Sequence, residues 1–195
     1  MRAQRSDAVR NKAALLAAAD QLFAASVAPA ELSMEDVATA AGVGKATLFR
    51  AFGSREGLIR ELWATHTAPL RSAIENGPPP LGPDTEPKVR IPAVLDAFLV
   101  LKLDNRHLWL AVEERSRDKR ETTLFERSAY REAHELLAGL LLAAGWSDRS
   151  DLLAHALLGV IRADLVDHLA RQRSRERMRA DLADLAETIL AKSHS

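Results

Sequence analysis

The chain has 195 residues, with 27 lysine and arginine residues against 27 aspartate and glutamate residues, and it contains no cysteine. The absence of cysteine excludes disulfides, thiolate metal sites and a thiol nucleophile, and an apolar content of 47% excludes disorder over most of the length. A formal net charge of zero gives no global signal for nucleic-acid binding, so any such function must depend on a local site.

The composition favours helices, because Ala, Leu, Arg and Glu dominate and no segment alternates strictly between apolar and polar residues. A first helix is predicted over residues 10–25, where apolar positions recur near the helical period, and Pro29 follows its end. Further helices are predicted over residues 34–41, 45–52 and 55–76. Ser33 and Ser54 are expected to cap the second and fourth of these helices.

Residues 77–92 are rich in proline and glycine and are expected to form a non-helical connector. Beyond this connector, helical patterns continue to the end of the chain, over residues 93–103, 107–116, 123–144, 150–173 and 174–192. Gly145 stands where a glycine is expected to end a helix. The predicted fold class is therefore all-α, with about nine helices.

Residues 33–55 have the helix lengths and spacing of a helix-turn-helix: two short helices joined at a glycine. Ala38 is small where the two helices must cross, and Gly42 permits the left-handed turn between them. Leu48 and Phe52 lie four residues apart and are expected to bury one face of the second helix. On spacing alone, a helical hairpin within an ordinary bundle remains an alternative. The residues left on the outer face are Lys45, Ala46, Thr47, Phe49 and Arg50.

The segment from Ser33 to Leu58, SMEDVATAAGVGKATLFRAFGSREGL, resembles the DNA-binding motif of the TetR/AcrR family of bacterial transcriptional regulators. The resemblance is specific from residue 10 to about residue 66. It implies a three-helix DNA-binding domain at residues 9–68, with its helix-turn-helix at about 33–52. It also implies a helical ligand-binding and dimerisation domain at residues 69–195.

The resemblance assigns roles by position. Lys45 and Ala46 match positions that contact bases, Thr47 matches a phosphate contact, and Arg55 matches a basic residue that binds the DNA backbone. The full set of expected DNA-binding residues is Ser33, Gly44, Lys45, Ala46, Thr47, Phe49, Arg50 and Arg55. Three positions depart from the family pattern: Phe49 replaces a common Tyr, Ala51 a common His or Tyr, and Gly44 a frequent Ser or Thr cap. Arg50 is expected to replace part of the missing phosphate contacts.

The second domain offers weaker signals. The candidate ligand-pocket residues are aromatic, polar or apolar side chains, each of which also occurs in ordinary helical cores: Phe98, Leu101, His107, Trp109, Glu113, Tyr130, His134, His155 and Asp164. The expected dimer interface consists of Leu157, Ile161, Met178, Leu182, Leu185 and Ile189, although the apolar seam from Met178 to Ile189 also suits an internal core. Asp164 and His168 are spaced for an i,i+4 ion pair rather than for a metal site.

These features predict a homodimeric transcriptional regulator, expected to be a repressor that a small-molecule effector releases from a palindromic double-stranded operator. No nucleophile–base pairing, metal-ligand spacing or phosphate-binding glycine loop stands out, so neither catalysis nor a cofactor nor a metal is expected. With no disulfides to explain and no signal peptide at residues 1–10, a cytoplasmic protein is expected. No apolar run approaches the ~20 residues of a membrane span, so no membrane partner is expected. The alternatives are an all-α enzyme and a relative that binds a protein rather than DNA.

Overall fold

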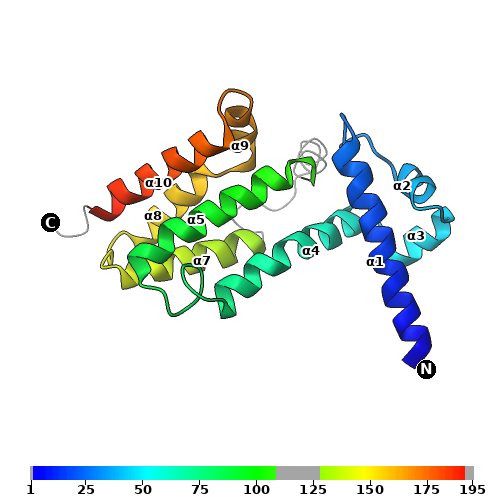
Figure 1. The fold of residues 1–195 in the computed structure, drawn as a ribbon, viewed down its shortest axis with the longest axis horizontal. Coiled ribbons are helices and arrows are strands. Elements are labelled where there is room, and N and C mark those ends of the chain that lie inside the picture. The colour runs from blue at the N-terminus through cyan, green and yellow to red at the C-terminus, as the bar shows by residue number, and fades with distance from the viewer. Residues whose placement is uncertain (1, 109–127, 192–195) are drawn as a thin grey trace. The chain divides into compact units, whose positions relative to one another are not determined.

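A computed structural model describes residues 2–108 and 128–191 of the chain. This part of the chain is helical and contains no strand, which confirms the all-α class (Figure 1). Its helices, in chain order, are α1 (Arg2–Ala25), α2 (Met34–Ala40), α3 (Lys45–Phe52), α4 (Arg55–Asn76), α5 (Pro87–Asp104), α7 (Ser128–Ala143), α8 (Ser150–Val160), α9 (Ala163–Ala170) and α10 (Arg175–Ala191). None of these described helices combines the length and the apolar character that crossing a bilayer requires.

The chain forms two compact units, and each has its own core. The described part of the first unit consists of residues 2–67 together with His107 and Leu108. Its buried side chains come mainly from α1, α2, α3 and α4: Leu15, Ala19, Phe23, Met34, Val37, Ala38, Leu48, Phe52, Leu58, Ile59, Leu62 and Leu108. Leu108 is 1% exposed, so a segment that follows α5 completes this core.

The first unit follows the predicted elements closely. Helices α3 and α4 have the predicted limits, and α2 ends one residue before the predicted limit. Helix α1 begins at Arg2 rather than at residue 10. At the start of α4, the Ser54 hydroxyl accepts a hydrogen bond from the Gly57 amide at 3.1 Å, as expected of a capping residue.

The second unit contains residues 68–106 and, from the later part of the chain, residues 128–191. Helix α5 packs against α7, α9 and α10, and α7 packs against α8. Most of the predicted helix over residues 107–116, and residues 123–127 of the next one, lie outside the described residues.

The proline-rich connector is shorter than predicted, because α5 begins at Pro87 and contains Pro92. Proline suits the first position of a helix, where its missing N–H group has no intrahelical partner to lose. The Glu86 side chain caps this start by accepting a hydrogen bond from the Val89 amide at 3.1 Å. Buried Arg90 then donates to the Leu81 and Ile74 carbonyls at 2.8 and 2.6 Å, which ties the connector to the helix.

The helix predicted over residues 150–173 is wrong, since two helices, α8 and α9, occupy this segment. The helix breaks at Ile161 and at Arg162, which has an extended backbone with ψ of 146°. The Lys102 ammonium of α5 donates to the freed carbonyl of Ile161. A cation at the carboxyl end of α8 is electrostatically favourable, so a tertiary contact stabilises this break.

The predicted dimer seam mostly belongs to the core of a single chain. Leu157 and Ile161 are each 1% exposed, Met178 and Leu182 are also buried, and Ile189 packs against the same core. Within a single chain these residues therefore belong to an internal core, the alternative that the sequence left open, and their place in a dimer interface stays a prediction. Leu185 differs from them, because 37% of it is exposed.

Candidate nucleic-acid interface

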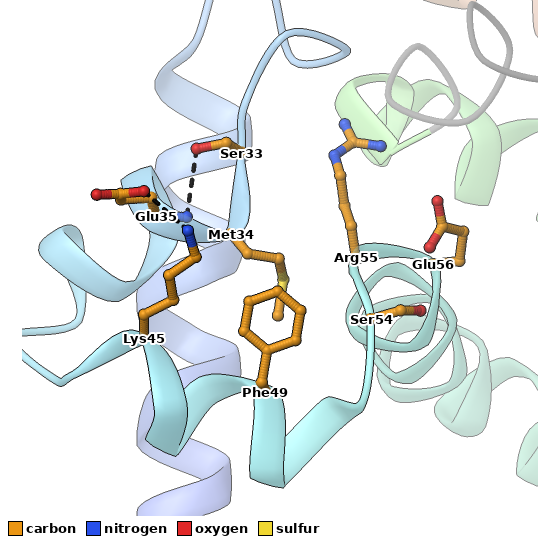
Figure 2. Close-up of a pocket in the computed structure, with 8 residues that line it drawn as sticks. All are labelled: Ser33, Met34, Glu35, Lys45, Phe49, Ser54, Arg55 and Glu56. Carbon is orange, nitrogen blue, oxygen red and sulfur yellow. Dashed lines mark hydrogen bonds and ion pairs between the residues drawn. The ribbon is translucent and has the colours of Figure 1, made fainter.

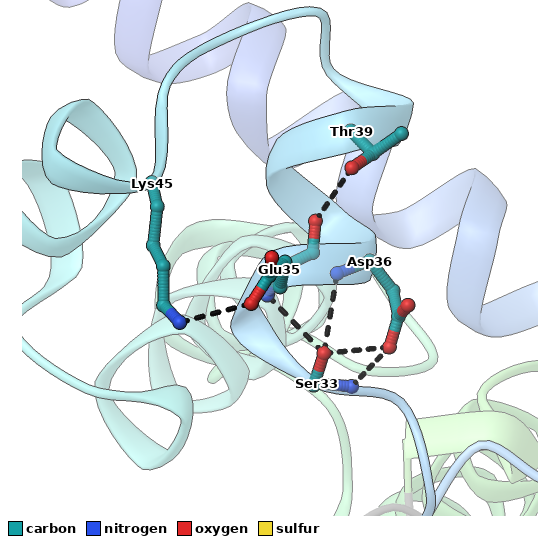
Figure 3. A network of polar contacts seen from close by, with 5 residues as sticks. All are labelled: Ser33, Glu35, Asp36, Thr39 and Lys45. Atoms are coloured by element: carbon teal, nitrogen blue, oxygen red, sulfur yellow. Dashed lines mark hydrogen bonds and ion pairs between the residues drawn. The ribbon is translucent and has the colours of Figure 1, made fainter.

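The start of α2 is held by a closed set of hydrogen bonds around Ser33 (Figure 3). The Ser33 hydroxyl accepts from the amides of Glu35 and Asp36, both at 3.2 Å, and donates to the Asp36 carboxylate at 2.6 Å. The same carboxylate accepts from the Ser33 amide at 2.8 Å. The Ser33 hydroxyl, followed by the Ser33 amide, holds the pKa of the Asp36 carboxyl below its ordinary value. This reciprocal capping box fixes where α2 begins.

The turn between α2 and α3 is set by Gly42 and Val43. Gly42 has a φ of 64°, in the left-handed region that glycine adopts without strain. The Gly42 amide donates to the Thr39 carbonyl, and the Val43 amide donates to the Ala38 carbonyl. This is the Schellman arrangement, which satisfies the last carbonyls of α2 and aims the chain into α3.

Helix α3 has one buried and one exposed face, as the sequence predicts. Leu48 is fully buried and Phe52 is 8% exposed, so they anchor the helix on the core of the first unit. The predicted contact residues Lys45, Ala46, Thr47, Phe49 and Arg50 are all exposed. Gly44, the N-cap residue, is also exposed and has no side chain to accept from the first amides of α3. The amino-terminal part of α3 therefore presents a lysine, small residues and a hydroxyl to solvent.

Lys45 is not alone on this surface. Its ammonium lies 3.0 Å from a carboxylate oxygen of Glu35 on α2, with both side chains largely exposed (57% and 72%) (Figure 3). An exposed pair of this kind contributes about 0–1 kcal/mol, so a DNA group can displace the carboxylate at little cost. The pair spans the turn between the two helices, and for that reason helical spacing within either helix gave no signal for it.

A depression of about 350 Å³ lies beside Lys45 (Figure 2). Figure 2 shows the Phe49 ring alongside the Met34 side chain at this depression, and 40% of Phe49 is exposed. The ring is thus a surface group rather than a core group. The lining residues come from the starts of α2, α3 and α4: Ser33, Met34, Glu35, Lys45, Phe49, Ser54, Arg55 and Glu56.

Arg55 occupies a different environment from the one expected of a phosphate contact. It is 6% exposed, and its guanidinium donates to the carbonyls of Leu32, Pro29 and Ala30 at 2.8, 2.9 and 3.2 Å. It also lies 5.5 Å from the centre of the Phe23 ring. Arg55 thus ties the start of α4 to the loop before α2, and its expected contact with the DNA backbone stays a prediction. No residue pattern near Arg55 predicts this inward orientation.

The predicted pocket residues are dispersed. Tyr130, His134 and His155 lie together where α7 meets α8: the two imidazoles stack with centroids 4.0 Å apart, and the Tyr130 hydroxyl lies 2.7 Å from His155 Nδ1. Burial raises the pKa of the Tyr130 phenol, so this hydroxyl keeps its proton. Phe98 and Leu101 are half-buried on α5, and Trp109 and Glu113 lie outside the described residues.

His107 and Asp164 have other partners. His107 belongs to the first unit, where its ring bonds to Asp20 at 3.2 Å. Asp164 accepts two hydrogen bonds from Arg162, which lower the pKa of its carboxyl. The contact expected between Asp164 and His168 is replaced, since the His168 ring contacts Gln172 at 3.2 Å.

Comparisons with known proteins agree with this geometry. Residues 15–62 match the family model of bacterial regulatory proteins, tetR family. No curated protein sequence matches the chain. A TetR-like transcriptional regulator from Rhodococcus sp. RHA1 is 22% identical with a TM-score of 0.64, covering 93% of this chain and 96% of its own. A proposed fatty acid metabolism regulator from Clostridium perfringens is 21% identical with a TM-score of 0.61, covering 89% and 96%.

The matched residues run from within α1 into α4 and include the capping box, the Gly42 turn and the exposed face of α3. The similar structures share the fold of both units, since each likeness extends over most of the chain. The helix-turn-helix segment thus matches the tetR family of bacterial regulatory proteins, and the chain has the fold of a TetR-like transcriptional regulator.

Proposed function

We propose that this protein is a homodimeric transcriptional repressor that binds a palindromic operator and is released from it by a small-molecule effector. Residues 9–68 act as the DNA-binding domain and residues 69–195 as the ligand-binding and dimerisation domain. The observation that carries the proposal is the exposed amino-terminal face of α3, with Lys45, Ala46 and Thr47 directed to solvent while Leu48 and Phe52 hold the helix in place.

In this proposal α3 enters the major groove. The Lys45 ammonium leaves Glu35 and reaches a guanine edge or a neighbouring phosphate, while Thr47 and the uncapped first amides of α3 bind phosphate. Arg50 adds a second exposed cation on the same helix. Because Arg55 is fully engaged with backbone carbonyls, it acts by positioning α4 rather than by touching DNA.

Dimerisation is proposed through the exposed apolar side chains of the second unit rather than through its core. Leu152 on α8 is 70% exposed and Leu185 on α10 is 37% exposed. A palindromic operator requires a twofold protein that places two copies of α3 in major grooves about 34–36 Å apart, or a multiple of that distance. Leu185 is thus the member of the predicted seam that remains a candidate contact.

Effector release is proposed to act through α4. This helix is continuous from Arg55, in the first unit, to residues beyond Ala68, in the second. An effector weakens operator binding only by the difference between its affinities for the two states of the protein. A hundredfold loss of operator affinity requires a difference of about 2.7 kcal/mol, and bound DNA then weakens effector binding by the same factor.

Fluorescence anisotropy on DNA that flanks the gene, at fixed salt, tests the proposal. We expect Lys45→Ala to cost about 1–3 kcal/mol of specific binding while the melting temperature is unchanged. Arg71→Ala is the matched control: it removes one cation that is 58% exposed and paired with Glu132 at 3.1 Å, close to the exposure and pairing of Lys45. Equal affinity of Lys45→Ala and the wild type for the operator would overturn the assignment of α3 as the recognition helix.

The alternative of a relative that binds a protein rather than DNA makes a different prediction in the same assay. A relative that binds a protein instead of DNA would show only weak binding that is equal for the flanking DNA and an unrelated duplex. It would also leave Lys45→Ala and Arg71→Ala indistinguishable. Titrating salt separates the two cases further, because a specific complex that neutralises phosphates loses affinity steeply as salt rises.

A further inference from the structure

Two histidines and one aspartate from distant parts of the chain converge within the first unit. Asp20 lies on α1, His66 on α4, and His107 just after α5. A single carboxylate oxygen of Asp20 lies 2.9 Å from His66 Nε2 and 3.2 Å from His107 Nε2. The ligand atoms of all three residues lie within 4.8 Å of one another.

The arrangement of the two rings allows both imidazoles to coordinate one ion. The His66 and His107 rings are nearly perpendicular, at 82°, with centroids 6.4 Å apart. An imidazole binds a metal through a lone pair in the plane of its ring, so two such rings can direct their Nε2 atoms at one ion without stacking on each other. Both Nε2 atoms contact the same carboxylate oxygen of Asp20, and this oxygen is the third ligand atom.

The distances suit a small divalent ion. A tetrahedral zinc ion bound at about 2.0–2.2 Å by nitrogen and oxygen places neighbouring ligand atoms roughly 3.3 Å apart. The present separations of 2.9 and 3.2 Å are within a few tenths of an ångström of that value. The side chains are 16–31% exposed, which leaves a route for the ion and room for a water molecule as a fourth ligand.

We propose that Asp20, His66 and His107 bind one divalent first-row transition-metal ion, with Zn²⁺ as the best-suited ion. Two imidazoles and a carboxylate are ligands that Zn²⁺ accepts, and the order of affinities also favours Ni²⁺ and Cu²⁺ over lighter ions. The inference concerns the first unit alone and is independent of operator binding.

A second cluster, formed by His134, Asp151 and His155, is a poorer metal site and serves as the internal comparison. Its ligand atoms also lie within 4.8 Å of one another, but its two imidazoles stack on each other, with ring planes 28° apart and centroids 4.0 Å apart. His155 Nδ1 already contacts the Tyr130 hydroxyl, and the Asp151 side chain is 81% exposed. Holding three ligands on one ion here would require the stack to open.

Metal binding at the first cluster would stabilise the first unit. His107 is next to Leu108, whose side chain is buried in the same core. An ion shared by α1, α4 and His107 would hold this later segment of the chain against the two helices. Because the ion binds the folded form and has no preformed site in the unfolded chain, it raises the melting temperature.

The test uses the full-length protein without an affinity tag, stripped with a chelator and titrated with Zn²⁺ alone against a chromophoric competitor. We expect one Zn²⁺ per chain and a higher melting temperature with the ion than with chelator. His66→Gln and Asp20→Asn should each weaken binding by about a hundredfold or more, since even an outer-shell partner changes affinity 10–100-fold. His134→Gln and His155→Gln are the matched controls and should retain the ion.

Two further readouts keep the outcome decisive. Co²⁺ in place of Zn²⁺ should give the intense visible absorption of a four- or five-coordinate site, and Asp20→Asn should remove it. His107→Gln provides a second ligand variant if His66→Gln does not fold in chelator. No stoichiometric Zn²⁺ at micromolar concentration, equal binding by Asp20→Asn, or loss only in His134→Gln or His155→Gln would each overturn the proposal.

Discussion

Two segments consist of amphipathic helices: α2 with α3, and α8 to α10. They differ in what their sequence patterns predict correctly. In α2 and α3 the apolar positions are buried and the outer positions are exposed, as local spacing predicts. In α8 to α10 the apolar seam is equally regular, but it faces the core of its own unit. The difference teaches that periodicity identifies a buried face without identifying its partner.

The largest expected effect comes from comparing a substitution on the buried side of α10 with one on its exposed side. Leu182→Ala should lower the free energy of unfolding by about 2–5 kcal/mol, because Leu182 is 7% exposed within the core of the second unit. Leu185→Ala should change it by no more than about 0.5 kcal/mol, because Leu185 is partly exposed. Urea denaturation measures both.

Light scattering extends this comparison to the dimer. Leu185→Glu should give a folded monomer with weakened operator binding, whereas Leu182→Glu should unfold the chain by placing a charge in the core. A folded, monomeric Leu182→Glu protein would show that Leu182 lies in the dimer interface rather than in the core. A dimeric Leu185→Glu protein would show that α10 is not the contact.

The next effect concerns Arg55, whose inward orientation differs from the role that the resemblance implies. Arg55→Ala should lower the free energy of unfolding by at least about 1.5–3 kcal/mol, the value of one hydrogen bond to a charged group, since it removes bonds to three carbonyls. Arg60→Ala, an exposed cation on the same helix, is the control and should be nearly neutral. If Arg55→Ala keeps its stability but loses affinity for every DNA sequence, Arg55 contacts phosphate after all.

A smaller effect follows from the break between α8 and α9. Burial lowers the pKa of the Lys102 ammonium to about 8, with Asp164 opposing and Arg162 adding to this shift. Between pH 8 and 10.5 the unfolded chain therefore binds more protons at Lys102 than the folded protein does, and the free energy of unfolding rises with pH. The rise is at most about 1.4 kcal/mol per pH unit, the limit for one proton.

Lys102→Met isolates this contribution, because other lysines and Tyr130 titrate in both proteins. The difference in unfolding free energy between wild type and variant, measured from pH 7 to 10.5, should grow in favour of the wild type. A constant difference across this range would mean that the Lys102 ammonium is well solvated in the folded protein.

The smallest effect tests the missing phosphate contact on α3. Phe49→Tyr should strengthen DNA binding by about 0.5–1.5 kcal/mol, because the ring lies at the surface and gains a hydroxyl donor. Phe52→Tyr is the contrasting variant: its ring is buried, so it should lower stability without improving affinity. Anisotropy at constant salt measures both, and an unchanged affinity for Phe49→Tyr would show that this ring does not face the DNA.

The predictable features are those governed by neighbours in the chain. Gly42 and Ser33 determine where α2 ends and begins, and Leu48 with Phe52 determines which face of α3 is buried. The features that were missed depend on distant contacts. No proline marks the break at Ile161, which Lys102 of another helix stabilises, and Gly159 two residues before it lies within α8. Nothing in the motif indicates that Arg55 turns inward.

The positions of titratable clusters were also beyond local reasoning. Asp20 and His66 are 46 residues apart, and Asp20 and His107 are 87 apart, so no spacing rule connects them. The same holds for Glu35 and Lys45, which meet across the turn rather than along a helix. Their proximity follows from how α1, α2, α3 and α4 pack, and packing is the information that a single sequence carries least directly.

The ion pair between Glu35 and Lys45 bears on how quickly this regulator finds its site. If Lys45 contacts the operator as proposed, long-range attraction to DNA is weak, because the chain has equal numbers of positive and negative residues and Lys45 is already paired with a carboxylate. Association then proceeds at the unsteered rate of about 10⁵–10⁷ M⁻¹ s⁻¹. Under the proposed function, selectivity then depends on residence time: the protein dissociates quickly from a sequence that offers Lys45 no substitute for the Glu35 carboxylate, and slowly from a site that does.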